Sequence, residues 1–364
     1  MKAVAVSPRQ KFSARLLEIP APKPGRREVL VQTLEIGIDG TDAEINEGLY
    51  GSAPANADFL IVGHEALGRV LAVGDEVADL QPGDLVVPMV RRPCPEACAN
   101  CRRDHFDMCS TGHYLERGIK GLHGFLSDLF VEEPRFLVKV PESIQTIATL
   151  LEPLSVVEKA VLQAFTIQHR LTWTPKTALV LGAGPIGLFA TMILQLHGLK
   201  TFTVDRVPEE SAKARIVSST GATYIKNESP SLNETAENIT RAVGDPIDFI
   251  VEATGYSPFV FQSMSLIGLN GVVALLGISG GDLHVRVPAD CLNLDMVLGN
   301  KLVFGSVNSN LDHFEQGLQH MHEFEQRWPG LFSQVVTRRL PLDEFSRSFE
   351  KEPGGIKTVL QLNR

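Results

Sequence analysis

Four of the five cysteines in this 364-residue chain lie within sixteen residues of one another. They are Cys94, Cys98, Cys101 and Cys109, and the fifth, Cys291, stands alone. Four thiolates suit a tetrahedral zinc ion with no open coordination position, so in a reducing compartment this cluster predicts a structural zinc site. Two disulfides, free thiols and an iron–sulfur cluster are the alternatives.

A second set of chemical groups comes from three separated segments. Asp39, His64 and Glu152 offer two carboxylates and an imidazole, and Glu65 adds a neighbouring carboxylate. A catalytic zinc ion needs about three protein ligands and one exchangeable position, which this set could supply. Spacing alone does not establish the site, because a single histidine is more often a core residue and carboxylates usually face solvent.

A glycine pattern follows a short apolar segment near the middle of the chain. Gly182, Gly184 and Gly187 form G-x-G-x-x-G, and Pro185 and Ile186 open the helix that follows. In this context the first glycine permits a tight turn, the second lets the backbone approach a pyrophosphate, and the third allows close packing of helix on strand. The pattern predicts a dinucleotide site, with a purely structural turn as the alternative.

The next predicted strand ends in an acidic residue, Asp205, about twenty residues after the glycines, where a carboxylate can bind the ribose 2′-hydroxyl. Such a carboxylate repels a 2′-phosphate, which favours NAD over NADP. The adjacent Arg206 argues for NADP, because a guanidinium can pair with that phosphate. Turns after two later predicted strands add Thr254 and Gly277 to the candidate cofactor-binding residues.

The elements that must position these residues change along the chain. Residues 1 to about 150 are rich in Gly, Pro and short apolar alternations, beginning with a strand at residues 1–6, and predict a β-rich domain. From about residue 177 strands alternate with helices, which predicts a doubly wound parallel sheet. From about residue 304 the alternation is lost, and we expect the chain to return to the first domain. The predicted elements of the sheet are strands at 178–181, 202–204, 249–252 and 272–276 and a helix at 186–197.

Composition argues against two classes of partner. The net charge is −9 and the chain has no basic run, which disfavours nucleic acid. No apolar run approaches the roughly 18 residues that a membrane span requires. Because residues 1–6 are typical of a first strand and not of a signal peptide, we expect a cytoplasmic protein.

Taken in order, these motifs resemble those of the zinc-containing medium-chain dehydrogenase/reductase family over nearly the whole chain. Most alcohol dehydrogenases of that family have a cysteine where this chain has Asp39, and the Asp-Gly-Thr-Asp form is similar to archaeal-type glucose 1-dehydrogenases. The motifs of the family are at 37–42, 63–65, 94–109, 152–153 and 182–187, and those of the subfamily at 90–92, 111–112, 116–119 and 305–308.

The resemblance implies an α/β fold of two domains. A GroES-like, β-rich catalytic domain would span residues 1–155, contain the structural-zinc lobe at about 91–112, and be completed by about 305–364. A Rossmann domain with a doubly wound parallel sheet would span 156–304. The family also implies a homotetramer or homodimer.

The resemblance also assigns roles. It implies Asp39, His64 and Glu152 as ligands of a catalytic zinc ion, with Glu65 exchanging in or holding the bound water. Each chain would then hold two zinc ions, one catalytic and one structural. The positions that match sugar contacts in the subfamily are Thr41, Glu116, Glu152 and Asn308; Thr41 is also a candidate for proton relay, and Asn308 for cofactor binding.

The implied activity is oxidation of an aldose at C1 to the aldonolactone, with hydride transfer to NAD(P). D-glucose is the first expected substrate, and D-galactose and other aldoses come next. The choice among these sugars stays open because Leu298 and Gly299 stand where the subfamily often has a histidine before Asn300 and Lys301. The alternatives are a polyol or secondary-alcohol dehydrogenase of the same family, and a zinc- and nucleotide-binding redox sensor without catalysis.

Overall fold

The computed structural model describes residues 1–229, 231–278 and 280–362. The chain folds into two compact units. Unit 1 comprises Met1–Ser155, Asn308–Met321 and Phe332–Arg364, and unit 2 comprises Val156–Val307 and His322–Leu331.

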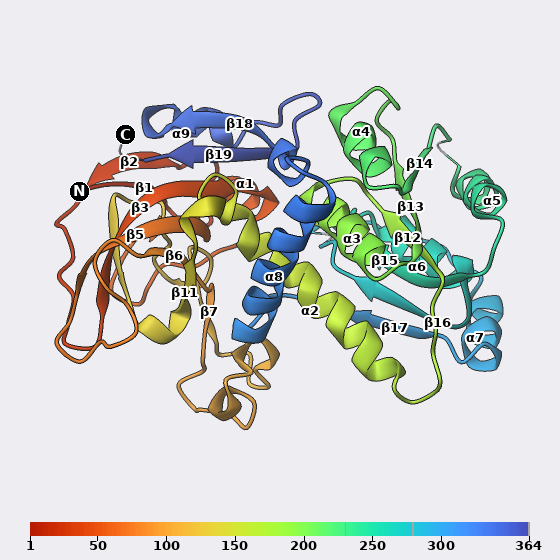
Figure 1. Ribbon diagram of the computed structural model, residues 1–364, viewed down its shortest axis with the longest axis horizontal. Helices are drawn as coiled ribbons and strands as arrows, with labels where there is room; N and C mark the ends of the chain where they lie inside the picture. Colours follow the sequence, from red (N-terminus) through yellow and green to blue (C-terminus); the bar gives the residue numbers. More distant parts are fainter. Residues whose placement is uncertain (230, 279, 363–364) are drawn as a thin grey trace. The chain divides into compact units, whose positions relative to one another are not determined.

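Unit 1 is built on β-sheets (Figure 1). Its main sheet has the order β11-β6-β5-β3-β19-β18, with β10 also paired to β3, and β18 and β19 are the parallel pair in an otherwise antiparallel sheet. The strands are β3 (Val29–Ile38), β5 (Glu65–Val73), β6 (Leu85–Pro88), β10 (Leu129–Glu132), β11 (Leu137–Val140), β18 (Val336–Pro341) and β19 (Lys357–Gln361).

Two three-stranded sheets complete the β structure of unit 1. They are β2-β1-β4, from β1 (Lys2–Val6), β2 (Arg15–Glu18) and β4 (Leu60–Ile61), and β7-β8-β9, from β7 (Arg91–Arg92), β8 (Leu115–Arg117) and β9 (Gly121–Leu122). Buried side chains of β1, β3, β4 and β5 form one apolar core. The helices are α1 (Gly40–Asn46), the start of α2 (Leu151–Gln168), the start of α8 (Leu311–Arg327), α9 (Phe345–Ser348), and the 3-10 turns η1 (Cys101–Arg103), η2 (Phe106–Met108), η3 (Pro134–Phe136), η4 (Glu142–Ile144), η5 (Ala148–Leu150), η6 (Phe332–Val335) and η7 (Leu342–Glu344).

Unit 2 is a six-stranded parallel sheet with the order β14-β13-β12-β15-β16-β17. The strand order reverses beside β12, and all five residues of that central strand are buried, as expected for a parallel sheet covered on both faces. The elements are β12 (Thr177–Leu181), β13 (Lys200–Asp205), β14 (Thr223–Lys226), β15 (Ile247–Glu252), β16 (Ile267–Leu275), β17 (Leu302–Gly305), α3 (Pro185–Leu196), α4 (Ala212–Ser219), α5 (Leu232–Val243), α6 (Ser257–Leu266) and α7 (Ala289–Leu298).

These elements confirm the predicted fold class, and the predicted strands correspond to β12, β13, β15 and β16. The largest difference is at β16, which begins at Ile267 where we expected residue 272. Gly268, Asn270 and Gly271 interrupt the apolar pattern there, and Asn270 has a left-handed φ of 58°. The strand nevertheless pairs with β15 through a register shift, so pairing outweighs the weak local signal.

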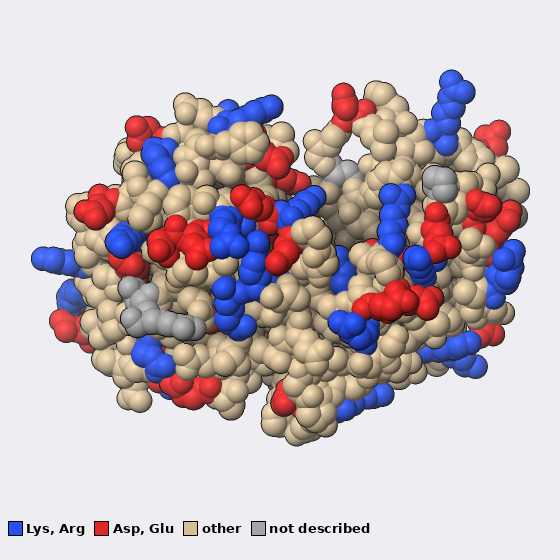
Figure 2. Space-filling model, turned by 90° about the horizontal axis from the view of Figure 1, so that it is seen from above, with Lys and Arg blue, Asp and Glu red and all other residues tan. Residues whose placement is uncertain are grey.

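Charged side chains of both signs are interspersed on the face shown in Figure 2. Within the described ranges, no helix combines the length and the apolar character that crossing a membrane would require.

The glycine turn after β12 depends on one close backbone approach. A Cβ atom at Gly187 would lie 1.8 Å from the carbonyl oxygen of Gly182, which itself has a φ of 100°. A Cβ atom at Gly184 would meet no atom within 4 Å, and its φ of −71° suits any residue. The two glycines therefore have different structural roles.

We predict that Gly187→Ala lowers the free energy of unfolding by about 2 kcal/mol or more, because backbone must move to admit the methyl group. Gly184→Ala, the matched control, should stay within about 0.5 kcal/mol of the parent. Urea denaturation of the three proteins measures the difference. Equal stability of the two variants would contradict the assigned packing role of Gly187.

Candidate functional site

The structure brings three of the predicted metal ligands together in unit 1. Asp39 follows β3 and caps α1, while His64 and Glu65 stand at the start of β5, directly after Gly63 with its φ of 83°. One potential ligand atom from each of Asp39, His64 and Glu65 lies within 4.8 Å of the others. Strand pairing between β3 and β5 therefore brings together residues that are distant in sequence.

The first turn of α1 orients this cluster. The Asp39 carboxylate accepts a hydrogen bond from the Asp42 backbone N–H (3.1 Å), and the Asp42 carboxylate accepts from the N–H groups of Asp39 (3.3 Å) and Gly63 (3.0 Å). The His64 ring lies between the two carboxylates, with Nε2 3.6 Å from Asp39 Oδ2 and Nδ1 3.7 Å from Asp42 Oδ1. Asp42 is fully buried, and its carboxylate places a negative charge beside the imidazole.

Burial and charge act in opposite directions on this histidine. Burial lowers the pKa of His64, but the Asp39 and Asp42 carboxylates outweigh burial and raise it well above its usual value. Burial raises the pKa of Asp39, and the charge of His64 more than compensates, so the net shift is downward. Without a metal, an imidazolium between carboxylates is the favoured state, and metal binding must displace its proton.

Glu152 lies in the first turn of α2 and is buried. Burial raises its pKa to about 8, and the nearby Glu65 and Asp39 carboxylates add to the shift while His64 opposes it. Among the described residues, Glu152 is not part of the group whose ligand atoms lie within 4.8 Å of one another. Its carboxylate is nevertheless close enough for the charges of Asp39, His64 and Glu65 to shift its pKa.

Lys357, which was not among the residues expected from the sequence, lies on β19 and forms an ion pair with Glu65 Oε2. Both side chains are 2% exposed. Burial lowers the pKa of Lys357, but Glu65 and Asp39 outweigh burial and the net shift is upward. Lys357 belongs to no recognisable motif. The apolar residues that follow it could have indicated a strand, but no sequence signal could have indicated that Lys357 pairs with Glu65.

The predicted sugar contacts Glu116 and Asn308 lie together, also in unit 1. Glu116 on β8 is opposite Arg91 on β7, and its Oε1 accepts from Arg91 Nε (3.0 Å) and Nη2 (2.9 Å) and from Asn308 Nδ2 (3.5 Å). Asn308 has a left-handed φ of 60°, and its buried Oδ1 has no hydrogen-bond partner among the residues that the structure describes. Thr41, in α1, hydrogen-bonds the Tyr50 side chain.

The four clustered cysteines also lie together, with their Sγ atoms within 4.8 Å of one another. All are free thiols, which disfavours the disulfide alternative. Hydrogen bonds from Ser110 and the backbone of Cys101 lower the pKa of Cys98 to about 5, while burial raises that of Cys101 to about 12. Four convergent sulfurs suit a closed tetrahedral ion.

In unit 2 the predicted nucleotide residues surround the glycine turn at the carboxyl ends of the strands. Asp205 Oδ2 accepts from the Ala183 N–H (2.7 Å) and Oδ1 from the Arg206 N–H (2.6 Å). A Cβ atom at Gly182 would lie 3.0 Å from Thr254 Cγ2. Pro185 and Ile186 open α3, so its N-terminus faces the turn.

Glu252, at the end of β15, is a buried residue that the sequence analysis did not select. Its Oε1 accepts from the Thr254 N–H (2.8 Å), and a Cβ atom at Gly277 would lie 2.8 Å from its Oε2 and 2.1 Å from Gly255 N. Glu252 therefore holds the turn that carries Thr254, and Gly277 leaves room for that turn.

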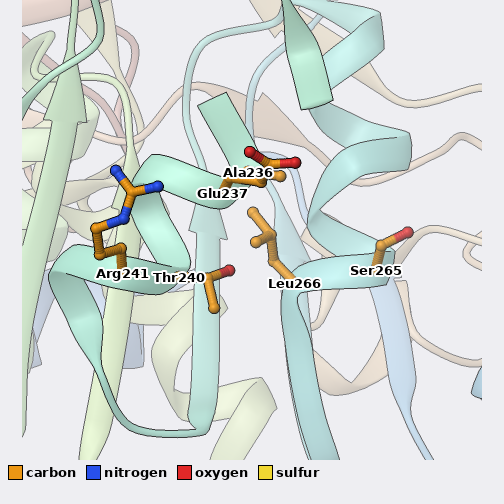
Figure 3. A pocket seen from close by; sticks show the side chains of 6 residues that line it. All are labelled: Ala236, Glu237, Thr240, Arg241, Ser265 and Leu266. Carbon is orange, nitrogen blue, oxygen red and sulfur yellow. The ribbon is translucent and has the colours of Figure 1, made fainter. Parts of the chain in front are cut away.

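A depression between α5 and α6 contains none of these residues (Figure 3). It is lined by Ala236, Glu237, Thr240, Arg241, Ser265 and Leu266. The figure shows side chains from both helices and no cluster of convergent catalytic groups.

Two family models match successive parts of the chain. Residues 25–142 match the alcohol dehydrogenase GroES-like domain, and residues 145–362 match the glucose dehydrogenase C-terminus. With a GroES-like domain and a doubly wound nucleotide-binding fold, the chain has the architecture of the medium-chain dehydrogenases.

Its relatives specify the family. Glucose 1-dehydrogenase of Methanocella arvoryzae is 44% identical over 100% of this chain and 99% of its own, and glucose 1-dehydrogenase 2 of Vulcanisaeta moutnovskia is 41% identical with the same coverage. The solved glucose dehydrogenase of Haloferax mediterranei, in complex with NADP, zinc and gluconolactone, has a TM-score of 0.90 at 35% identity, with 100% of both chains covered. This chain belongs to the glucose dehydrogenase family, which confirms the resemblance.

The raised pKa of Glu152 predicts a pH-dependent stability of the metal-free protein. An unfolded glutamate loses its proton near pH 4.5 and the folded Glu152 near pH 8, so between these values the unfolded chain binds fewer protons and stability falls as pH rises. We expect Glu152→Gln to match the parent near pH 4.5 and to be more stable by on the order of a few kcal/mol at pH 8.

The measurement is urea denaturation of both proteins in chelator across this pH range. Asp58→Asn, which changes an exposed carboxylate, is the control and should follow the parent at every pH. A constant difference between Glu152→Gln and the parent would refute the assigned shift.

Proposed function

We propose that this protein oxidises an aldose at C1 to the aldonolactone, with zinc as a resident metal and NAD(P) as hydride acceptor. D-glucose is the preferred substrate, and D-galactose and other aldoses are the alternative substrates. The observation that carries the proposal is the cluster of Asp39, His64 and Glu65, with buried Glu152 beside it, in a chain related over its full length to glucose 1-dehydrogenases.

The residues of the cluster fit a zinc ion. Carboxylate oxygens and an imidazole nitrogen are ordinary zinc donors, and Asp42 supplies the outer carboxylate that commonly orients a ligating histidine. Asp39, His64 and Glu152 would hold the ion, with Glu65 exchanging in or holding a water molecule. The four cysteines would hold a second, structural zinc ion.

A bound zinc ion supplies Lewis acidity, which lowers the pKa of the anomeric hydroxyl. The protein's own groups then bind and orient the sugar: Asn308 Oδ1 is an acceptor for a hydroxyl, and Glu116 holds the Asn308 amide. Thr41 and Tyr50 offer a path for the hydroxyl proton. The hydride leaves C1 for the nicotinamide, giving lactone, NAD(P)H and a proton.

The nucleotide would bind at the carboxyl ends of β12, β13, β15 and β16, with its pyrophosphate at the N-terminus of α3. We propose a preference for NAD. The Asp205 carboxylate is fixed by the Ala183 and Arg206 N–H groups, so its charge stays beside the ribose position. The Haloferax relative was solved with NADP, and in this chain Arg206 is the group that would favour the 2′-phosphate.

The assembly that we propose is a homotetramer or homodimer in the cytoplasm, and we propose domain boundaries at residues 155–156 and 304–305. β17 is one of the two edge strands of the parallel sheet, and neighbouring elements expose large apolar side chains, which supports self-association through unit 2. These side chains are Leu269 on β16 and Leu294, Val297 and Leu298 on α7.

The activity is tested with the purified protein, a panel of aldoses and polyols, and both nucleotides. We expect two zinc ions per chain and turnover of D-glucose, and we expect Asp39→Ala to lose one zinc ion and activity by at least about a thousandfold. Asp58→Ala is the control and should keep both. Turnover of polyols alone would favour the alternative dehydrogenase, and one zinc ion with no turnover of any substrate would favour a redox sensor.

The cofactor preference is tested at residues 205 and 206. Removing the fixed charge in Asp205→Asn should raise kcat/KM with NADP relative to NAD by about tenfold, because one repulsive contact of about 1.4 kcal/mol is lost. Arg206→Ala should shift the ratio toward NAD. If the ratio of kcat/KM with NADP to that with NAD is unchanged in both variants, neither side chain distinguishes a ribose 2′-hydroxyl from a 2′-phosphate.

A further inference from the structure

A buried ion pair between Lys357 and Glu65 lies at the edge of the cluster of Asp39, His64 and Glu65. Because a lysine is not among the expected metal ligands, metal binding alone does not explain this pair. Lys357 on β19 reaches across β3 to Glu65 on β5, and the pair passes over Gly37, which lies opposite both Glu65 and Val359 in the sheet. A Cβ atom at Gly37 would lie 2.1 Å from Glu65 Oε2 and 3.1 Å from Lys357 Cε. The sheet therefore leaves space specifically for this pair.

Glu65 is close enough to compete for the metal. Its carboxylate belongs to the group whose ligand atoms lie within 4.8 Å of one another, so one ion could bind Asp39, His64 and Glu65 at once. With Glu152 as a further ligand, such an ion would have four protein ligands and no exchangeable position. A catalytic zinc ion must keep one position open for water or substrate.

We propose that Lys357 is a positioning residue that competes with the metal for the Glu65 carboxylate, so that Glu65 can exchange into the ligand set without occupying it permanently and one coordination position stays open for the sugar. This inference rests on the proposed zinc-dependent function. The ammonium group engages the Glu65 carboxylate in a charge-assisted interaction, and its positive charge is fixed on the Glu65 side of the cluster. Without Lys357, buried Glu65 would have the metal as its nearest available cation.

The proposal predicts opposite changes in metal binding and catalysis. In Lys357→Met, which replaces the ammonium group with an apolar side chain of similar length, catalytic-site zinc should bind at least tenfold more tightly. At the same time kcat should fall and the KM for the aldose should rise by about tenfold, because the sugar must displace Glu65. The KM for the nucleotide should stay unchanged. A merely structural role for Lys357 would weaken zinc binding and catalysis together.

The double variant Lys357→Met/Glu65→Gln isolates the competing ligand. Because an amide is a poor zinc ligand, we expect the gain in affinity to disappear and the aldose KM to return toward the parent value. Lys357→Arg keeps the charge and should keep zinc affinity within about threefold of the parent. If Lys357→Met fails to fold, Lys357→Gln tests the same loss of charge with a polar side chain.

Zinc affinity is measured at pH 8 by competition with a chromophoric chelator, with the four-cysteine site as the internal control. Two zinc ions in the parent and tighter binding in Lys357→Met support the inference. Two zinc ions in the parent and unchanged or weaker binding in that variant overturn it and leave the proposed function standing. One zinc ion in the parent overturns the proposed function itself.

Discussion

Three buried carboxylates, those of Asp42, Glu65 and Glu152, surround one imidazole in unit 1, and each loses its hydration there. Such a cluster is costly unless every charge has a partner. His64 meets the charge of Asp42 and of the partly exposed Asp39, Lys357 meets that of Glu65, and burial raises the pKa of Glu152 to about 8. The order of the strands allows this pairing, since β5, β3 and β19 are neighbours in the main sheet.

In unit 2 the decisive constraint is a close approach of backbone atoms and not the pairing of charges. Its turn between β12 and α3 needs a carbonyl and a helix to approach more closely than any side chain permits, which fixes glycine at residue 187. Two acidic residues then secure the neighbouring turns: Asp205 through the Ala183 N–H, and Glu252 through the Thr254 N–H. The same carboxylates that shape the site thus set the electrostatic field that a nucleotide would meet.

Much of this was predictable because the responsible signals are local. The four cysteines, the glycine pattern and the strand-helix alternation each occupy one continuous segment, so spacing alone indicated them. Asp39, His64 and Glu152 needed family resemblance, since no local rule joins three distant segments. Lys357 was not selected, and Asp42 entered only as part of the Asp-Gly-Thr-Asp motif. A lysine in a C-terminal strand is ordinarily a surface residue, and the burial of Lys357 results from strand pairing that the sequence does not encode locally.

The position of β19 between β3 and β18 has a consequence for biosynthesis. β3, which pairs with β19, and β5, which carries Glu65, leave the ribosome long before residues 357–361 are made, so a nascent chain carries the Glu65 carboxylate without its ammonium partner. During that interval the cluster lacks the positive charge that Lys357 adds in the folded protein, and a divalent cation near Glu65 meets less opposing charge. Insertion of the last strand is therefore the step at which the Glu65 carboxylate gains its buried ammonium partner.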